Sequence, residues 1–214
     1  NLAPADLHKD GSHYDLPIAL GILVELEVIS QQQMEQFVAL GEVSLDGSIN
    51  SIVGVLPAAI GANAITRGII CPKENGSEAA WSGNNDILAP GTLLELVNHF
   101  KNLQILSRPQ TKIANDNTSY PDLLDIKGQK IAKRALEVAA AGGHNMLMIG
   151  PPGSGKSMLA KRLPGLLPPL TMEEMLEVSI ISSVAGQLKE GAVIKTRPFR
   201  EPHNSASMAA IVGG

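Results

Sequence analysis

Residues 150–157 read Gly-Pro-Pro-Gly-Ser-Gly-Lys-Ser, and this segment constrains the fold of the chain more than any other. It matches the phosphate-binding loop pattern G-x-x-x-x-G-K-[ST] at every fixed position. The apolar residues 146–149 before it predict a buried strand at the centre of a parallel sheet, and residues 158–163 after it predict a helix. Because the loop lies between a strand and a helix, we favour a phosphate-binding loop of an α/β domain over a simple glycine-rich turn.

The residue types of this loop suit a nucleoside triphosphate. Glycines let the backbone curl so that amides point at an anion, and the following helix adds the positive end of its dipole. Lys156 is the predicted catalytic residue, which stabilises charge on the β- and γ-phosphates, and Ser157 is the predicted Mg²⁺ ligand. The predicted nucleotide-binding residues are Gly150, Pro151, Pro152, Gly153, Ser154, Gly155, Lys156, Ser157 and Met158.

Hydrolysis also requires an acidic residue after a second apolar strand, which holds Mg²⁺ and polarises water. In residues 158–214 the best match is Met175-Leu176-Glu177. This match fails as a strand, because Thr171-Met172-Glu173-Glu174 is a capping box that opens a helix toward Ile181. We therefore expect the chain to bind nucleotide but to lack its own hydrolytic acid.

The charge of the chain changes sign near its middle. Residues 1–106 carry 4 Lys+Arg and 12 Asp+Glu, whereas residues 107–214 carry 13 and 9. Between the two halves, residues 107–121 lose all apolar periodicity and are rich in turn formers. We predict a domain over 1–106, a linker over 107–121 and a second domain over 122–214. The first residue is Asn1 and the last two are glycines, so we expect both domains to be truncated.

Composition excludes several classes of protein. The single cysteine, Cys71, leaves no internal disulfide and no multi-cysteine zinc site, and no histidine pair has ligand spacing. No apolar run reaches the roughly 18 residues of a membrane span, and no signal pattern is present. Aromatic residues make up 3% of the chain, which disfavours a base-stacking single-strand binder. We expect a cytoplasmic protein with neither a membrane nor a zinc partner.

Local patterns in the first half predict a mixture of helices and strands. Asp15 before Pro17 predicts a helix N-cap, and Asp46-Gly47 predicts a two-residue hairpin turn within residues 41–50. The remaining predicted elements are helices over 53–65, 93–100 and 129–141 and a strand over 68–71.

Three stretches in the second half resemble the magnesium-chelatase-like AAA+ ATPases. They are Asp125-Ile126-Lys127-Gly128-Gln129, the run from Ala139 through Ser157, and the run from Pro198 through Ser207 into Gly213-Gly214. In the first half, residues 9–19 and 41–60 resemble the Lon-protease-like domain of the ComM/YifB branch. The resemblance implies an α+β Lon-protease-like (ribosomal S5-like) domain followed by a truncated α/β P-loop AAA+ core with a parallel sheet.

The resemblance also implies a function for the intact protein. It implies a bacterial, cytoplasmic, hexameric ring ATPase that uses ATP and Mg²⁺, and in this branch a DNA branch-migration motor that assists recombination during natural transformation. Lys127, Lys130, Lys133 and Arg134 form a basic cluster, for which a solvated helix face is the default interpretation; contacts with DNA phosphates would fit the positive charge of this half.

Two alternatives stay open. One is the motor subunit of a magnesium chelatase, against which the Lon-like domain argues. The other is an ATP-dependent protease or a scaffold. Peptidase Lon domains use a Ser–Lys dyad, whose positions fall on Asp15 and Leu56 here, and these residues cannot form a nucleophile–base pair. We therefore expect no peptidase activity and interpret Asp15 as a helix cap.

Overall fold

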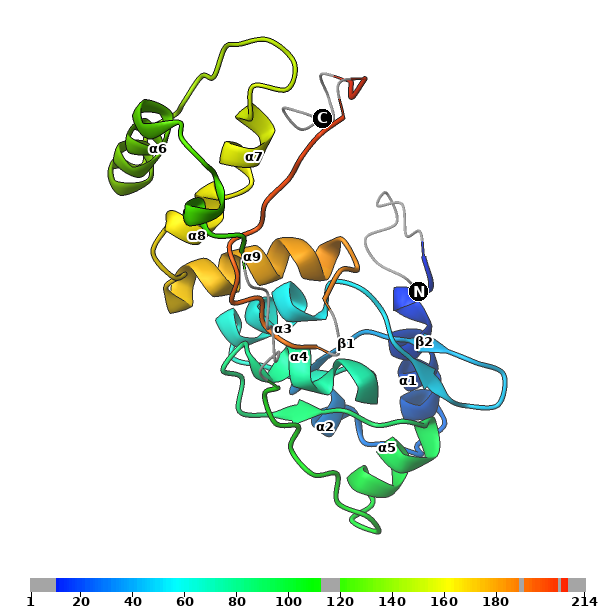
Figure 1. Ribbon diagram of the computed structural model, residues 1–214. Helices are drawn as coiled ribbons and strands as arrows, with labels where there is room; N and C mark the ends of the chain where they lie inside the picture. Colours follow the sequence, from blue (N-terminus) through cyan, green and yellow to red (C-terminus); the bar gives the residue numbers. More distant parts are fainter. Residues whose placement is uncertain (1–10, 113–119, 189–190, 204, 208–214) are drawn as a thin grey trace. The chain divides into compact units, whose positions relative to one another are not determined.

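The computed structural model describes residues 11–112, 120–188, 191–203 and 205–207 (Figure 1). The chain divides into two compact units. The first unit comprises residues 1–114 and 172–194, and the second comprises residues 115–171 and 195–214. The division predicted from the sequence keeps 122–214 together, so the units differ from it by the transfer of 172–194 to the first unit. As a statement about domains, the predicted division stays a prediction.

The first unit is built on a three-stranded parallel sheet. Its strands are β1 (Phe37–Ala39), β4 (Gly68–Ile70) and β5 (Ile87–Leu88), in the order β1-β4-β5. Val38 is paired with Ile69, and Ile70 with Leu88. The predicted fold places a parallel sheet in the second half of the chain; in the structure, the parallel sheet lies in the first unit.

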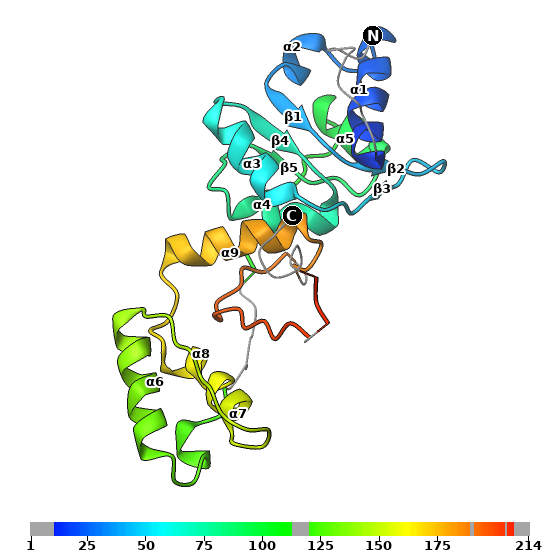
Figure 2. The same cartoon turned by 90° about the horizontal axis from the view of Figure 1, so that it is seen from above.

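Helices cover both faces of this sheet (Figure 2). Successive side chains of a strand point to opposite faces, so Ile70 joins one buried cluster and Ile69 the other. The first cluster includes residues of α1 (Asp15–Glu25) and α5 (Leu93–Phe100). The second includes residues of α3 (Val55–Ala64) and α4 (Gly76–Ala80). The shorter elements of this unit are η1 (Ser12–Tyr14), α2 (Gln31–Met34) and η2 (Lys73–Asn75).

Three predicted elements of the first half are confirmed: α3, α5 and β4. Helix α5 has the predicted bounds, and its N-cap Thr92 accepts a hydrogen bond from the amide of Glu95. The predicted cap of α1 is wrong. The N-cap is Tyr14, and Asp15 is the first helical residue, with no capping hydrogen bond from a side chain at this end. An acid in the first turn still interacts favourably with the helix dipole.

The predicted hairpin is present, but its turn is longer than predicted. Strands β2 (Glu42–Val43) and β3 (Ile49–Asn50) pair antiparallel. The amide of Gly47 donates to the carbonyl of Ser44, and the amide of Ser44 donates to the carbonyl of Ser48. These bonds enclose three loop residues, of which Gly47 has a φ of 84°. The turn is therefore a three-residue loop with glycine at its left-handed position.

Helix α9 (Met172–Val184) packs on α3 within the first unit. It begins where the capping box predicts. Its buried residues are Ser179, Ser182 and Ser183, whereas Ile181 is 66% exposed. The burial of hydroxyls rather than aliphatic side chains requires hydrogen-bond partners, and Ser179 and Ser183 have them.

The second unit is helical in its described part. It contains η3 (Leu123–Asp125), α6 (Lys130–Gly142), α7 (Lys156–Ala160) and α8 (Leu163–Leu166). Its buried core consists of Ile126, Leu136 and Leu159. The helix predicted over 158–163 is thus two short helices. The partly buried side chains around the core are Leu123, Ala132, Met146, Met148, Leu163 and Leu166.

The strand predicted over residues 146–149 is not formed in the described part of this unit. Met146 and Met148 pack against the core, whereas Leu147 is 83% and Ile149 88% exposed. The side chains thus alternate as in a strand, but a strand also needs a hydrogen-bonded neighbour. The prediction was wrong because apolar composition cannot show whether such a neighbour exists.

Among the helices of the described residues, none is long and apolar enough to cross a membrane.

Candidate functional site

The predicted phosphate-binding residues form one loop between residue 150 and the start of α7. Gly153 and Gly155 have φ angles of 79° and 87°, in the left-handed region that favours glycine. A Cβ atom built on either glycine meets no atom within 4 Å, so the backbone conformation, rather than crowding, calls for glycine here. Gly155 is the N-cap of α7, and its carbonyl accepts the amide of Leu159. Leu159 is 3% exposed and anchors α7 in the core.

The ammonium group of Lys156 lies within the curve of this loop. Its Nζ donates to the carbonyl oxygens of Gly150 and Pro151, both at 2.8 Å, and to the hydroxyl of Ser154 at 3.2 Å. These three acceptors are neutral, and none of them compensates the positive charge of the lysine. The loop therefore presents a cation on a glycine-rich backbone, which suits an anionic ligand.

A hollow of about 210 Å³ is lined by Gly153, Ser154, Gly155, Lys156, Ser157 and Met158. Ser157 is exposed, and Met158 is 49% exposed. The structure thus brings six of the nine predicted ligand-binding residues together around one hollow, whereas Gly150, Pro151 and Pro152 do not line it. Their roles toward ATP and Mg²⁺ stay predictions, and so does the role of Ser157 as a metal ligand.

The donor set of the loop fits a polyphosphate with Mg²⁺. Lysine and backbone amides at positive-φ glycines are groups that bind phosphate oxygens, and a serine hydroxyl is a hard oxygen ligand for Mg²⁺. In the described part of the chain, no three His, Cys, Asp or Glu residues are grouped so that they could hold a metal by themselves. In this loop, Ser157 would hold a magnesium ion together with the oxygens of the phosphates.

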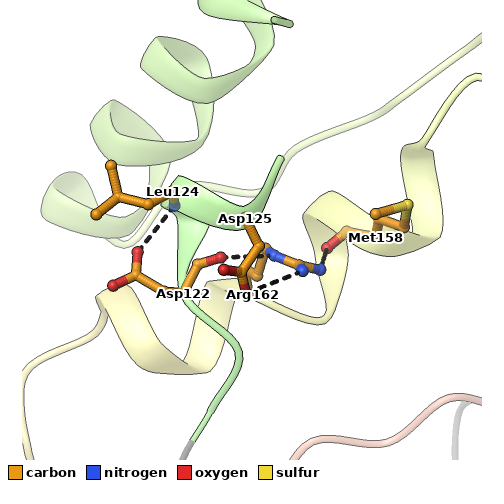
Figure 3. A network of polar contacts seen from close by, with 5 residues as sticks. All are labelled: Asp122, Leu124, Asp125, Met158 and Arg162. Atoms are coloured by element: carbon orange, nitrogen blue, oxygen red, sulfur yellow. Dashed lines mark hydrogen bonds and ion pairs between the residues drawn. The ribbon is translucent and has the colours of Figure 1, made fainter. Parts of the chain in front are cut away.

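Two residues outside the motif hold this region together, and sequence analysis missed both. Gln129, the N-cap of α6, has a φ of 54°, and its Nε2 donates to the carbonyl of Ser154 at 3.3 Å. Arg162 is 9% exposed and bonds to the chain around η3 (Figure 3). Most of their acceptors are main-chain carbonyls, which every residue has, so the sequence does not indicate these contacts.

The two positions of a Lon-type dyad hold no catalytic pair. The side chain of Leu56 is fully buried, and its amide donates to Oε1 of Glu78 at 3.0 Å. Asp15 lies in the first turn of α1. An aliphatic side chain supplies no base, so the arrangement agrees with the expectation of no peptidase activity, which stays a prediction.

Several residues that carry the family resemblance lie outside the described part of the chain. These are Lys9, Asp10, Asn204, Gly213 and Gly214; residues 113–119 of the predicted linker also lie outside the described part. The described residues of the run 198–207 belong to the second unit, where Glu201 forms an ion pair of 2.9 Å with Lys161 just after α7. The basic cluster lies on and just before α6; Arg134 pairs there with Glu137 at 3.0 Å.

Two family models match the chain, and both describe the same protein. "Magnesium chelatase, subunit ChlI" matches residues 122–214, and "Subunit ChlI of Mg-chelatase" matches residues 1–75. An archaeal Lon protease of Halobacterium salinarum is 39% identical over 66 residues, which cover 28% of this chain and 9% of that protein. The Lon match supports a Lon-related segment and leaves the finer domain arrangement a proposal.

Curated relatives match along the whole chain. Competence protein ComM of Haemophilus influenzae is 42% identical over 221 residues, and the protein YifB of Salmonella typhimurium is 41% identical over 214 residues. Each alignment covers 100% of this chain but 43% and 42% of the relative, so the chain spans about two fifths of their length. The chain belongs to the magnesium-chelatase-like family, of the type represented by ComM and YifB.

Proposed function

We propose that residues 150–157 bind ATP together with Mg²⁺ and that the full-length protein hydrolyses it. The observation that carries this proposal is the Lys156 ammonium, held 2.8 Å from two carbonyls of a loop with positive-φ glycines. In this role Lys156 stabilises negative charge on the β- and γ-phosphates, and the Ser157 hydroxyl holds Mg²⁺. Membership of an AAA+ ATPase family supports the proposal. We propose that the hydrolytic acid lies outside residues 158–214.

For the full-length protein, we propose that ATP hydrolysis drives the remodelling of DNA. The supporting observations are the similarity to a protein named for competence and the positive charge of residues 107–214, which carry 13 Lys+Arg against 9 Asp+Glu. Basic side chains on α6 supply groups that pair with DNA phosphates. The proposed assembly is a cytoplasmic ring, a hexamer by family, that acts in branch migration during recombination and natural transformation.

A second function has support of its own. Both family models describe a subunit of magnesium chelatase, so a motor that acts on a tetrapyrrole through partner subunits is the main alternative. An ATP-dependent protease or scaffold is a weaker alternative, because Leu56 occupies the position of the dyad lysine. The three functions share the nucleotide site and differ in the molecule that stimulates turnover.

One experiment separates the three. ATP turnover of the full-length protein is measured alone and with forked DNA, a porphyrin or casein, and DNA binding is measured in parallel. We expect forked DNA to bind and to raise turnover, and Lys156→Ala to abolish turnover under every condition. If forked DNA neither binds nor changes turnover, the DNA proposal fails. A rise in ATP turnover with porphyrin would instead establish the chelatase alternative, and degradation of casein would establish the protease alternative.

A further inference from the structure

An open, mainly apolar groove runs along helix α6 in the second unit. It has a volume of about 670 Å³, and residues 144–146 line it together with the helix. Ile131 is 88% exposed and Val138 49% exposed, although both side chains are large and apolar. Ile131, Ala135 and Val138 are spaced as i, i+4 and i+7, which places them on one face of the helix. This spacing is typical of a helix face that packs against another helix.

The charged side chains of the groove are cationic. Lys130 and Arg134 belong to its lining, and Arg134 also pairs with Glu137 at 3.0 Å. Lys130 is the first residue of α6, where the helix dipole adds to its positive potential. The groove therefore suits a ligand that combines apolar with acidic groups, and its positive end is the N-terminal end of α6.

DNA does not match this groove as well as a helix does. DNA phosphates would pair with the cations but would leave the exposed apolar side chains of Ile131 and Val138 in water. Lys127 and Lys133 lie outside the lining, so these two cations stay available to DNA. An apolar helix with acidic residues at one end covers the apolar face and also pairs with Lys130.

Helix α1 of the first unit presents a face of this kind. Leu16 and Leu20 are buried in the core, whereas Ile18 and Ile22, on the other side of the helix, are 40% and 56% exposed. A helix that is apolar all round is normally buried on all sides. The last residue of α1 is Glu25, which is exposed and acidic.

We propose that α1 of one copy of this chain packs antiparallel in the α6 groove of a second copy. The antiparallel direction brings Glu25, at the C-terminal end of α1, to Lys130, at the N-terminal end of α6, and it also aligns the helix dipoles favourably. The two helices have 11 and 13 residues, or about 16 and 20 Å, so their apolar faces match in length.

The charges of the chain select this pair of surfaces over a symmetric one. Residues 1–106 carry 4 Lys+Arg and 12 Asp+Glu, and residues 107–214 carry 13 and 9. Two α6 grooves would bring together the cations of both copies, and two α1 faces would bring together their carboxylates. A contact between α1 and α6 pairs opposite charges and leaves one surface of each kind free, so further copies add until a ring closes. The inference rests on the proposed ring and assigns one of its interfaces.

The test measures self-association of the full-length protein by sedimentation equilibrium. Lys130→Glu and Glu25→Lys each oppose like charges at the contact, and each is expected to weaken association by roughly tenfold. Both changes place the favourable sign of charge at a helix end, so both helices are expected to stay folded, as checked by circular dichroism. Lys133→Glu is the matched control on the same helix, outside the groove lining, and is expected to change association by less than about twofold.

Rescue of the two variants identifies the occupant of the groove. In an equimolar mixture of Lys130→Glu and Glu25→Lys, every α1 finds a groove of opposite charge on a copy of the other variant. The mixture and the double variant are both expected to associate within about threefold of the wild type. Recovery by the double variant without recovery by the mixture would show that α1 of the same chain fills the groove, which overturns the role of the second copy.

The remaining outcomes separate this interface from the proposals on which it rests. A wild type that stays monomeric at every concentration overturns the ring and the interface together, whereas ATP binding by residues 150–157 is measured on its own. A wild type whose association the single variants leave unchanged overturns the interface alone. If Lys130→Glu weakens binding of forked DNA and leaves association unchanged, the groove belongs to DNA, and the inference is overturned.

Discussion

The hydroxyl of Ser183 donates a hydrogen bond of 2.5 Å to Oε1 of Glu78, although 105 residues separate the two in the sequence. Glu78 is 4% exposed, and the same oxygen accepts the amide of Leu56. Its second oxygen accepts the side-chain amide of Asn75 at 3.0 Å. The buried carboxylate is therefore surrounded by donors from three segments, and it ties helix α9 to the first unit.

Replacement of Glu78 by glutamine is expected to destabilise the first unit by about 1–3 kcal/mol, because a buried donor then faces another donor. The Asn75 amide cannot turn to compensate, since its oxygen accepts the amide of Ile52 and its nitrogen donates to the carbonyl of Ile52. Urea unfolding gives the free energy of the wild type and of each variant. Glu74→Gln, at an exposed neighbouring site, is the control and is expected to be nearly neutral. Equal effects of the two variants would contradict the account.

Substitution by alanine is expected to have opposite effects on stability at two glycines of the first unit. A Cβ on Gly68 lies 2.6 Å from the carbonyl oxygen of Asp86 and from the ring of Phe37, so the strands around β4 must shift. Gly68→Ala is expected to lower the free energy of unfolding by about 1–3 kcal/mol. Gly61 lies on an exposed face of α3 with nothing within 4 Å of a Cβ, and Gly61→Ala is expected to raise stability by about 0.5–1 kcal/mol. Thermal unfolding measures the stability of both variants. A change of stability in the same direction for both would be inconsistent with this packing.

Cys71 is expected to resist chemical modification in the folded protein. It is fully buried after β4, and burial raises the pKa of its thiol to about 12, with a smaller contribution from the negative charge of Glu78. The reactive thiolate is therefore scarce at neutral pH, and a reagent must wait for the structure to open. Iodoacetamide labelling at pH 8 is expected to be at least about 100-fold slower in buffer than in urea. Similar rates under the two conditions would show that Cys71 is accessible, and Cys71→Ser controls for labelling elsewhere.

Protonation of His99 is expected to lower the stability of the first unit in mild acid. Burial lowers the pKa of its imidazole below the ordinary value of about 6.5. Its Nδ1 also accepts the amide of Leu106 at 3.1 Å, which requires that nitrogen to be unprotonated. Because the folded-state pKa is the lower one, the stabilisation is complete above about pH 6.5 and is lost as the pH falls through the folded pKa.

The variant His99→Asn keeps an acceptor at this position and removes the titration. Its free energy of unfolding is expected to depend less on pH between 7 and 5 than that of the wild type, as measured by urea unfolding at a series of pH values. A proton NMR titration gives the folded pKa directly. A pKa of His99 above its ordinary value would reverse the sign and reject the prediction.

The local patterns that were predicted correctly are those whose cause is also local. Thr92 caps α5, and the apolar period of residues 93–100 fixes the bounds of that helix. Asp46-Gly47 places the hairpin turn, because glycine is needed at its left-handed position. The turn has one residue more than predicted, since Leu45, fully exposed, joins the loop rather than a strand. The loop conformation of residues 150–155 also has a local cause, because Gly153 and Gly155 adopt the positive φ angles that glycine favours; its role in binding phosphate stays a prediction.

The features that were missed depend on distant partners. Helix α9 buries serines, and one of them, Ser183, donates a hydrogen bond to Glu78. A helix face rich in serine is typical of a solvent-exposed surface, so the sequence alone does not indicate this burial. Arg162 binds main-chain carbonyls, which every residue possesses. Residues 146–149 have the composition of a strand, but strand formation depends on a neighbouring chain segment. Sequence patterns thus located the candidate site but not the contacts that hold it.

The most direct test of the account is the affinity of the protein for ATP before and after Lys156→Ala. Calorimetry with Mg²⁺ is expected to show ATP binding by the wild type and at least a roughly tenfold loss in the variant, because in the proposed function the Lys156 ammonium pairs with the phosphates. Lys161→Ala, which removes a lysine 49% exposed just after α7, is the control for a general loss of positive charge and is expected to retain most of the affinity. An affinity of Lys156→Ala equal to that of the wild type would contradict the assignment of residues 150–157 as the nucleotide site.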